Sequence, residues 1–281
     1  MAETILVVSP HLDDAALSIG GSIAAWIAGG HRVVIASLYT TGPPLDELAP
    51  SMRRFADYQT RRAEDDQACA ALGAEVRRLD QVERAFRRPY LANWSFFSTP
   101  DDRSGFTTLE AVTRALDPLA ALAPARILVP LGIGNHVDHV EAMIAATDWA
   151  HARGWLGRVA FYEDFYALSG TMRRRHFVAR QRLWRRRDAP LLRARRLAAI
   201  LSAIAAARRG PEVETFLIPE LREARWTLTT TNVRGHEQRQ LDAIACYASQ
   251  TFAFGGLDGI TRAIKKAHAW WGHAEPLWLA R

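Results

Sequence analysis

The chain has 281 residues, of which 49% are hydrophobic and 23% charged, and its mean hydropathy is −0.12. These values are typical of a soluble globular protein and exclude a disordered chain or a fibrous repeat. No apolar run approaches the ~20 residues of a bilayer span, and the apolar start, residues 4–8, is too short for a signal-peptide core. We therefore expect no membrane span and a cytoplasmic protein. The two cysteines, Cys69 and Cys246, have no nearby Cys or His partner, which argues against a disulfide framework or a zinc–cysteine site.

The net charge is +6, and the excess is concentrated in one stretch. Thirteen arginines lie between Arg173 and Arg209, against a single acidic residue, Asp188. Such a stretch is either a phosphate or nucleic-acid site or a solvated helix face in an arginine-rich protein. Because it has no zinc-finger or RNA-binding signature and no interleaved aromatic residues, we expect no nucleic-acid partner.

The first elements alternate between strand and helix. Residues 4–9 form a continuous apolar run rich in β-branched residues, which is typical of a strand buried on both faces of a parallel sheet. Helical spacing follows over 15–28, then a second strand over 32–38 and a helix over 57–72. This βαβα order predicts a parallel sheet with right-handed crossovers.

The alternation continues as far as about residue 165. We predict strands over 75–79, 126–131 and 158–162, and helices over 108–122 and 138–153. The fold class is therefore α/β, with a Rossmann-like, mostly parallel sheet flanked by helices and a core of about residues 1–170.

The remaining residues, about 171–281, have a different pattern. We predict a basic helical segment over residues 171–209, an edge strand over 214–229 and a helix over 236–248. The chain has no repeats and no flexible linker, so we predict a single domain, 1–281, in which this helical and edge-strand extension packs on the core.

A polar cluster follows the first strand, immediately before a helix. His11, Asp13 and Asp14 lie at the carboxyl end of the strand, where open α/β sheets bind ligands. One imidazole and two carboxylates suit a zinc site with a general base. Alternatively, Asp13 or Asp14 caps the helix.

A second polar cluster follows the strand at 126–131, again before a helix. His136 and His139 are three residues apart at the helix start, with Asp138 between them as a partner for one of the rings. The alternative is a pair of surface histidines with Asp138 as a cap. Because both clusters lie at the same edge of a parallel sheet, their convergence favours a metal site.

These segments together resemble the LmbE-like or PIG-L superfamily of zinc-dependent N-deacetylases. Residues 9–21, Ser-Pro-His-Leu-Asp-Asp-Ala-Ala-Leu-Ser-Ile-Gly-Gly, look like its first signature, and 136–139, His-Val-Asp-His, look like its second. The resemblance also includes 61–64, 162–164 and 247–250, the last being similar to a segment of one bacterial branch. The usual Pro and Glu beside the Asp pair are Leu12 and Ala15 here, which leaves the metal ligands intact but puts detail around them in doubt.

The resemblance implies a role for each polar residue of the two clusters. His11, Asp14 and His139 would bind zinc and leave an open position, at which the metal activates water and polarises an amide carbonyl. Asp13 would be the general base. Beside the ligand His139, His136 would donate to the developing oxyanion as an imidazolium, while Asp138 would orient one histidine and favour its protonated form.

Five other residues are weaker candidates for substrate binding. Arg61 is either an anion binder or a partner of the acidic residues that follow it. Glu163 and Asp164 are either ligands of substrate hydroxyls or simple loop carboxylates, and His236 lies where a later loop would complete the pocket. Trp94 could stack on a sugar ring.

The resemblance implies a metal-dependent hydrolase that removes an N-acetyl or other N-acyl group from a small-molecule amino sugar or glycoconjugate. A His2Asp site accepts iron as well as zinc. The alternatives are a thiol-conjugate or long-acyl amidase with the same site, or a non-catalytic sugar-binding protein of the same fold. A homo-oligomer is left open.

Overall fold

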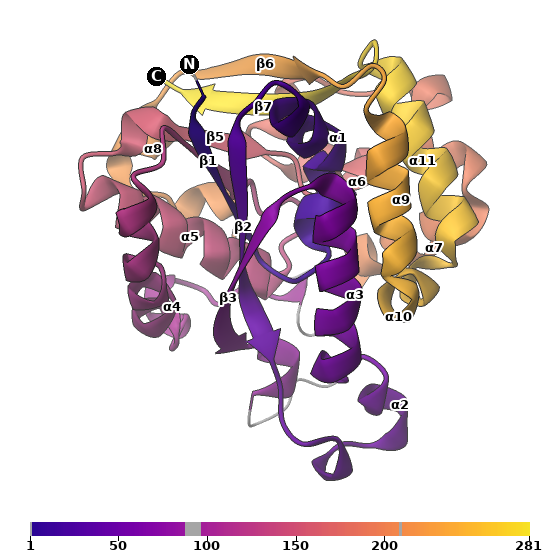
Figure 1. The fold of residues 1–281 in the computed structure, drawn as a ribbon, viewed down its shortest axis with the longest axis horizontal. Coiled ribbons are helices and arrows are strands. Elements are labelled where there is room, and N and C mark those ends of the chain that lie inside the picture. The colour runs from indigo at the N-terminus through magenta and orange to yellow at the C-terminus, as the bar shows by residue number, and fades with distance from the viewer. Residues whose placement is uncertain (1, 88–96, 208–209) are drawn as a thin grey trace.

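The computed structural model describes residues 2–87, 97–207 and 210–281, and contains one seven-stranded sheet in the order β3-β2-β1-β4-β5-β7-β6 (Figure 1). The strands are β1 (Thr4–Ser9), β2 (Arg32–Thr41), β3 (Glu75–Val82), β4 (Arg126–Pro130), β5 (Val159–Tyr162), β6 (Trp226–Asn232) and β7 (Ala274–Ala280). The α-helices are α1 (Asp14–Ala28), α2 (Pro50–Arg53), α3 (Tyr58–Leu72), α4 (Leu109–Ala115), α5 (Val137–His151), α6 (Gly170–Arg175), α7 (Arg195–Ala207), α8 (Pro219–Glu223), α9 (Glu237–Cys246), α10 (Ala248–Thr251) and α11 (Leu257–Trp270). None of the helices in these described ranges is long and apolar enough to cross a membrane.

The first five strands are parallel, and their order places the candidate site. β1 lies between β2 and β4, with Leu6 paired to Val34 on one side and to Ile127 on the other. The direction in which the chain adds strands therefore reverses between β1 and β4. In α/β sheets the crevice at the carboxyl ends of two such strands is the usual ligand site. The α/β class and the mostly parallel sheet predicted from the sequence are confirmed.

Apolar side chains fill both faces of the sheet, as the continuous hydrophobic strands predict. Along β1, Ile5 and Val7 belong to a core shared with α1 and α3, whereas Leu6 and Val8 belong to a core shared with α5. All four are fully buried. Packing on both faces of the sheet thus holds β1, whose carboxyl end leads into the first polar cluster, in a fixed position.

The C-terminal region differs from the sequence prediction in two ways. It adds two strands instead of one: β7 lies antiparallel to β5, and β6 forms the outer edge. The basic stretch is not one helix, because α6 ends at Arg175 and α7 begins only at Arg195, with short 3-10 turns between them. Pro190 lies in that interval and has no N–H with which to continue a helix. Pro118 similarly follows the end of α4, where a helix had been predicted as far as residue 122.

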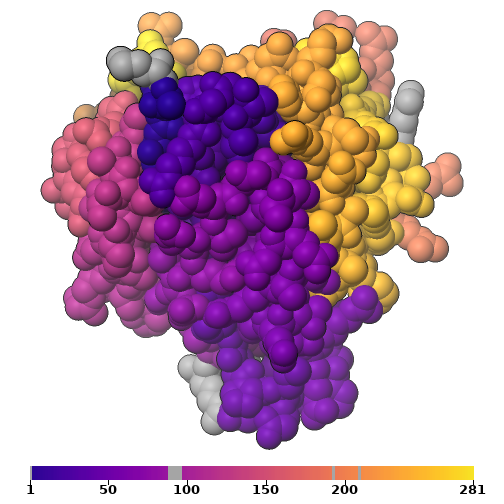
Figure 2. Space-filling model, in the orientation of Figure 1, coloured from indigo at the N-terminus to yellow at the C-terminus, as the bar shows by residue number. Residues whose placement is uncertain are grey.

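The C-terminal region packs directly on α1, as Figure 2 shows for its orange and yellow residues beside the indigo and purple start of the chain. α1 is kinked at Ile19, and the Glu275 carboxylate of β7 accepts backbone hydrogen bonds from Gly21 (3.1 Å) and Ser22 (2.7 Å). A Cβ at Gly20 would lie 2.7 Å from Cγ of Gln240 in α9. The glycine pair of the first signature therefore permits a close approach between the two regions.

Candidate functional site

Three side chains converge at the ends of β1 and β4. One ligand atom from each of His11, Asp14 and His139 lies within 4.8 Å of the others. Oδ2 of Asp14 is 3.0 Å from Nδ1 of His11 and 3.2 Å from Nε2 of His139. Ligand atoms about 2.0–2.1 Å from a tetrahedral zinc ion are themselves roughly 3.3 Å apart. The three side chains are therefore placed to hold one divalent cation.

The second ring nitrogen of each histidine contacts a different carboxylate. Nε2 of His11 lies 3.3 Å from Oδ2 of Asp138, and Nδ1 of His139 lies 2.6 Å from Oδ1 of Asp164. Such carboxylates fix the tautomer and ring orientation of metal-binding histidines. The other oxygen of Asp164 accepts the Ile133 N–H at 2.9 Å, and the residue is 1% exposed. Of the two interpretations left open for Asp164, a ligand of substrate hydroxyls or a loop carboxylate, the structure favours neither: the carboxylate supports His139.

The chemistry of this donor set fits a metal. Nε2 of His139 is buried and makes no hydrogen bond to any described residue, which costs free energy unless another partner binds it. Burial opposes the charge of Asp14, but His139 and His11 outweigh it and hold the pKa of Asp14 well below its ordinary value. A second group of donors, His11, His136 and Asp138, is also compact. There both oxygens of the Asp138 carboxylate accept the N–H of Arg84, whereas only Oδ2 of Asp14 accepts a backbone N–H from a described residue, that of His11, so the first group is the better site.

Asp13 lines a polar cavity of about 110 Å³ beside the three donors. It occupies the N-cap position of α1, yet its side chain makes no capping hydrogen bond, so the capping alternative is not supported. Burial raises the pKa of Asp13 to about 6, with the charge of Asp14 adding to the increase and Arg61 opposing it. A carboxylate with a pKa in this range is suited to accept a proton near neutral pH.

His136 lines the same cavity and caps α5. Its Nδ1 accepts the backbone N–H of Asp138 at 3.3 Å, and its ring stacks on Tyr166 at 6.3 Å between centroids. Burial lowers the pKa of His136 well below its ordinary value, and the nearby His11 and His139 lower it further. With Nδ1 accepting a hydrogen bond and the pKa lowered, the geometry favours a neutral ring with its proton on Nε2 over the imidazolium expected from the sequence. Asp138, which was expected to orient one histidine, contacts the ring of His11.

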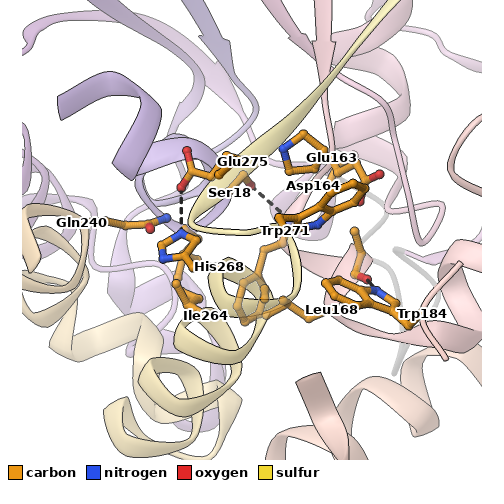
Figure 3. Close-up of a pocket in the computed structure, with 16 residues that line it drawn as sticks. Ser18, Glu163, Asp164, Leu168, Trp184, Gln240, Ile264, His268, Trp271 and Glu275 are labelled. Atoms are coloured by element: carbon orange, nitrogen blue, oxygen red, sulfur yellow. Dashed lines mark hydrogen bonds and ion pairs between the residues drawn. The ribbon is translucent and has the colours of Figure 1, made fainter. Parts of the chain in front are cut away.

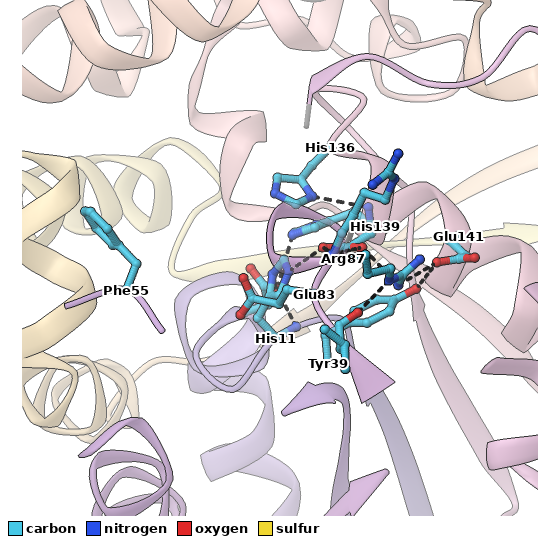
Figure 4. A network of polar contacts seen from close by, with 12 residues as sticks. His11, Tyr39, Phe55, Glu83, Arg87, His136, His139 and Glu141 are labelled. Carbon is cyan, nitrogen blue, oxygen red and sulfur yellow. Dashed lines mark hydrogen bonds and ion pairs between the residues drawn. The ribbon is translucent and has the colours of Figure 1, made fainter. Parts of the chain in front are cut away.

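Behind His11, a buried polar network supports Asp138 (Figure 4). Arg87 lies 3.5 Å from the Asp138 carboxylate and 3.1 Å from that of Glu141. The hydroxyl of Tyr39 donates to Glu141 at 2.7 Å. Because every member is held by another element, the network leaves the His11–Asp138 contact little freedom to move.

Arg61 reaches the cavity, but its ion pair is with Glu83 and not with the acidic residues that follow it in the chain. Its Nη1 also donates to the carbonyl of Phe55 at 3.0 Å. The buried Nε has no hydrogen-bond partner among the residues described.

The structure does not bring Glu163 or His236 to the polar cavity. Glu163 accepts hydrogen bonds from Arg173 (2.8 Å) and Trp278 (3.1 Å), and it lines a separate cavity of about 50 Å³ (Figure 3). Arg173 is fully buried, so this member of the basic stretch is not on a solvated face.

His236 lies at the start of α9, whereas the other end of that helix approaches the site. There the hydroxyl of Tyr247 lies 2.9 Å from the carbonyl of Leu12. The predicted candidate Trp94 lies outside the described residues.

Sequence reasoning missed three residues that line the polar cavity: Glu83, Tyr166 and Gln250. Glu83 directly follows β3, but the strand was predicted to end three residues too early, so this residue was not expected at a strand end. Tyr166 lies two residues after Asp164, and Gln250 belongs to the 247–250 segment. A signal for both was thus present in the neighbouring residues.

The sequence matches the model of the PIG-L family, described as GlcNAc-PI de-N-acetylase, over residues 6–150, slightly more than half of the chain. The chain belongs to this family. The resemblance seen in its two signatures is thereby confirmed. Among curated proteins, none matches the sequence.

Solved structures share the fold over nearly the whole chain. A40926 pseudoaglycone deacetylase Dbv21 is 21% identical, covers 99% of this chain and 96% of its own, and has a TM-score of 0.66. A deacetylase of teicoplanin biosynthesis, crystallised with bog, is 19% identical, with coverages of 98% and 96% and a TM-score of 0.68. N,N'-diacetylchitobiose deacetylase from Pyrococcus horikoshii is 13% identical, with coverages of 98% and 83% and a TM-score of 0.51.

Proposed function

We propose that this PIG-L family protein is a metal-dependent hydrolase that removes an N-acyl group, acetyl in the simplest case, from an amino-sugar substrate. The observation that carries the proposal is the set of carboxylate contacts made by His11 and His139. Each directs one nitrogen to Asp14 and the other to a supporting carboxylate. The description of the family and the names of the three similar structures described above, which are deacetylases, support the reaction class and the amino sugar.

His11, Asp14 and His139 would hold the cation, which supplies polarisation of the amide carbonyl and activation of a water molecule. Zinc suits this donor set, and iron(II) suits it as well. The residues support a divalent metal, and zinc is our proposal for its identity.

Two other residues of this chain transfer the proton of the attacking water and stabilise the negative charge that develops on the carbonyl oxygen. Asp13 takes a proton from the attacking water and passes it to the leaving amine as the C–N bond breaks. His136, neutral and protonated on Nε2, donates a hydrogen bond to the carbonyl oxygen as negative charge develops there. The products are a carboxylate and a free amine.

The test is acetate and amine release by zinc-loaded protein from free, nucleotide-linked and glycoside-linked N-acetylglucosamine. We expect release from at least one of these, abolished by a chelator and restored by zinc. Release that persists in chelator would refute metal dependence. If neither these nor longer-acyl analogues are cleaved although the metal is bound, the non-catalytic sugar-binding alternative replaces the proposal.

A further inference from the structure

A second, much larger cavity adjoins the polar one. Its volume is about 570 Å³, compared with about 110 Å³ for the polar cavity. Its apolar wall comes from five separate segments of the chain and includes Phe55, Phe86, Phe97, Ile200, Ile204 and Phe254. Nothing in the proposed deacetylation of a sugar requires an apolar space of this size.

The polar side chains of the wall all line the polar cavity as well: Arg61, Glu83, His136, Tyr166 and Gln250. The rest of the wall offers little to a polar ligand. Arg61 and Glu83 line it where the two cavities join, and they form an ion pair with each other. At its rim Phe252 is 60% exposed, with the guanidinium of Arg54 4.0 Å from the ring centroid. Burying apolar surface against such a wall is favourable, whereas sugar hydroxyls would lose their hydrogen bonds to water.

The position of the reacting groups shows which part of a substrate would enter the larger cavity. His136 and Tyr166 line both cavities, whereas Asp13 lines only the polar one. In the proposed reaction Asp13 serves the leaving amine and His136 serves the acyl oxygen. An acyl group held between them would have its amine toward the polar cavity, and its chain would extend past His136 into the apolar cavity. Figure 4 shows Phe55 standing apart from His136 and Glu83, and all three line this cavity.

We propose that the apolar cavity binds the hydrocarbon chain of the acyl group, so that the preferred substrate is a long-chain N-acyl amino sugar. This inference rests on the proposed function and names its substrate class. The cavity volume lies within the range of about 300–1,000 Å³ that drug-sized ligands fill, and the methyl group of acetyl would leave nearly all of it empty. Water adds to the acyl carbon, the C–N bond breaks, and a fatty carboxylate and a protonated amine are released.

The first test is a chain-length series with zinc-loaded protein. In one arm the N-acyl group of glucosamine is acetyl, hexanoyl or decanoyl; in the other the N-acetyl group is kept and an alkyl glycoside is lengthened. We expect kcat/KM to rise about fourfold per methylene in the first arm until the cavity is filled, and to stay flat in the second. A flat first arm overturns the inference but leaves the proposed function intact. A rise only in the second arm assigns the cavity to the aglycone and also overturns it. No release in either arm overturns the proposed function, and the inference with it.

The second test uses matched substitutions. Ala253 lines the cavity, so Ala253→Trp should fill part of it and lower the ratio of decanoyl to acetyl kcat/KM at least about tenfold. The control is Ala203→Trp, at an exposed position of α7 outside the lining, which should keep the wild-type ratio. If Ala253→Trp does not fold, Ile200→Asn, at a half-buried position of the wall, tests the same point.

Calorimetry with decanoate gives a readout that does not depend on turnover. We expect decanoate to bind the wild type and Ala203→Trp, and to bind Ala253→Trp or Ile200→Asn at least about tenfold more weakly. Equal binding by folded wall variants and wild type would overturn the assignment of the cavity.

Discussion

Two regions of the chain contribute to the candidate site in different ways. Residues 4–162, the parallel α/β unit, supply His11, Asp13, Asp14, His136 and His139 from the ends of two strands. Residues 163–281 supply Asp164 behind one histidine and much of the wall of the apolar cavity, from loops and from α7 and α10.

The first region holds the groups proposed to carry out the reaction, and the second contributes to the selectivity for the substrate. The family match ends at residue 150, so it includes the proposed metal donors and the base but not Asp164 or the wall at residues 200–254. Regular strands fix the reacting atoms, and irregular segments shape the space around them. We therefore expect changes at the strand ends of the first region to affect every substrate. Changes in the cavity wall, to which both regions contribute, should affect chain-length preference, and other changes in the second region should affect metal affinity or stability.

The largest effect is expected for His139→Ala, which removes one proposed donor from the first region. Metal binding and turnover should be lost together, with kcat/KM falling by about 10³-fold or more, because metal activation contributes several kcal/mol to such reactions. Metal content after dialysis and amine release from one preparation measure both. A variant that keeps its metal and its activity would rule out His139 as a ligand.

Asp13→Asn should separate chemistry from metal binding within the same region. Since Asp13 is not among the three proposed donors, the variant should retain the metal, while kcat falls by about 10²–10⁴-fold through loss of the base. Asp46→Asn, in an exposed loop, is the control for the same chemical change. Turnover near the wild-type rate in Asp13→Asn would disprove the assignment of the base.

Asp164→Asn tests the one contact that the second region makes with the proposed metal site. The loss of its charge beside Nδ1 of His139 should weaken metal binding by about 10–100-fold. A metal titration followed by activity should show that excess metal restores most of the turnover. Asp188→Asn, elsewhere in the C-terminal region, should titrate like the wild type. An unchanged titration for Asp164→Asn would show that the Asp164–His139 contact does not tune the site.

Much of the first region was predictable from the sequence. Continuous apolar runs predict buried parallel strands, and parallel strands bring their carboxyl ends to one edge, so His11 and His139 could be placed together without coordinates. The partners of the two rings could not be assigned. Asp138 was expected to orient one histidine, without saying which, and Asp164 was left open between a substrate ligand and a loop carboxylate. Side-chain directions after a strand depend on loop backbone, which periodicity does not report.

The second region was harder to predict for physical reasons. β7 is a strand whose side chains are buried by packing between β5 and β6, and that pairing is visible only in three dimensions. The basic stretch was predicted as one helix because its arginines favour helices, but Pro190 interrupts it. The apolar cavity draws residues from segments far apart in the chain, so no local pattern indicates it.

The smallest effect on turnover is expected for Gly20→Ala, which tests how the two regions are held together. Alanine normally stabilises a helix interior by about 1 kcal/mol relative to glycine. Here the new methyl group would lie 2.7 Å from Cγ of Gln240, a side chain that is itself buried, so we expect a net loss of about 1–3 kcal/mol in the free energy of unfolding. Gly157→Ala, at an exposed position with no atom within 4 Å, should change stability by no more than about 0.4–1 kcal/mol, in the stabilising direction. Denaturant unfolding of both variants shows whether each change raises or lowers the free energy of unfolding. If Gly20→Ala also stabilised the protein, α9 would have to move away at this contact. The C-terminal region would then not pack as closely on α1 as the structure shows.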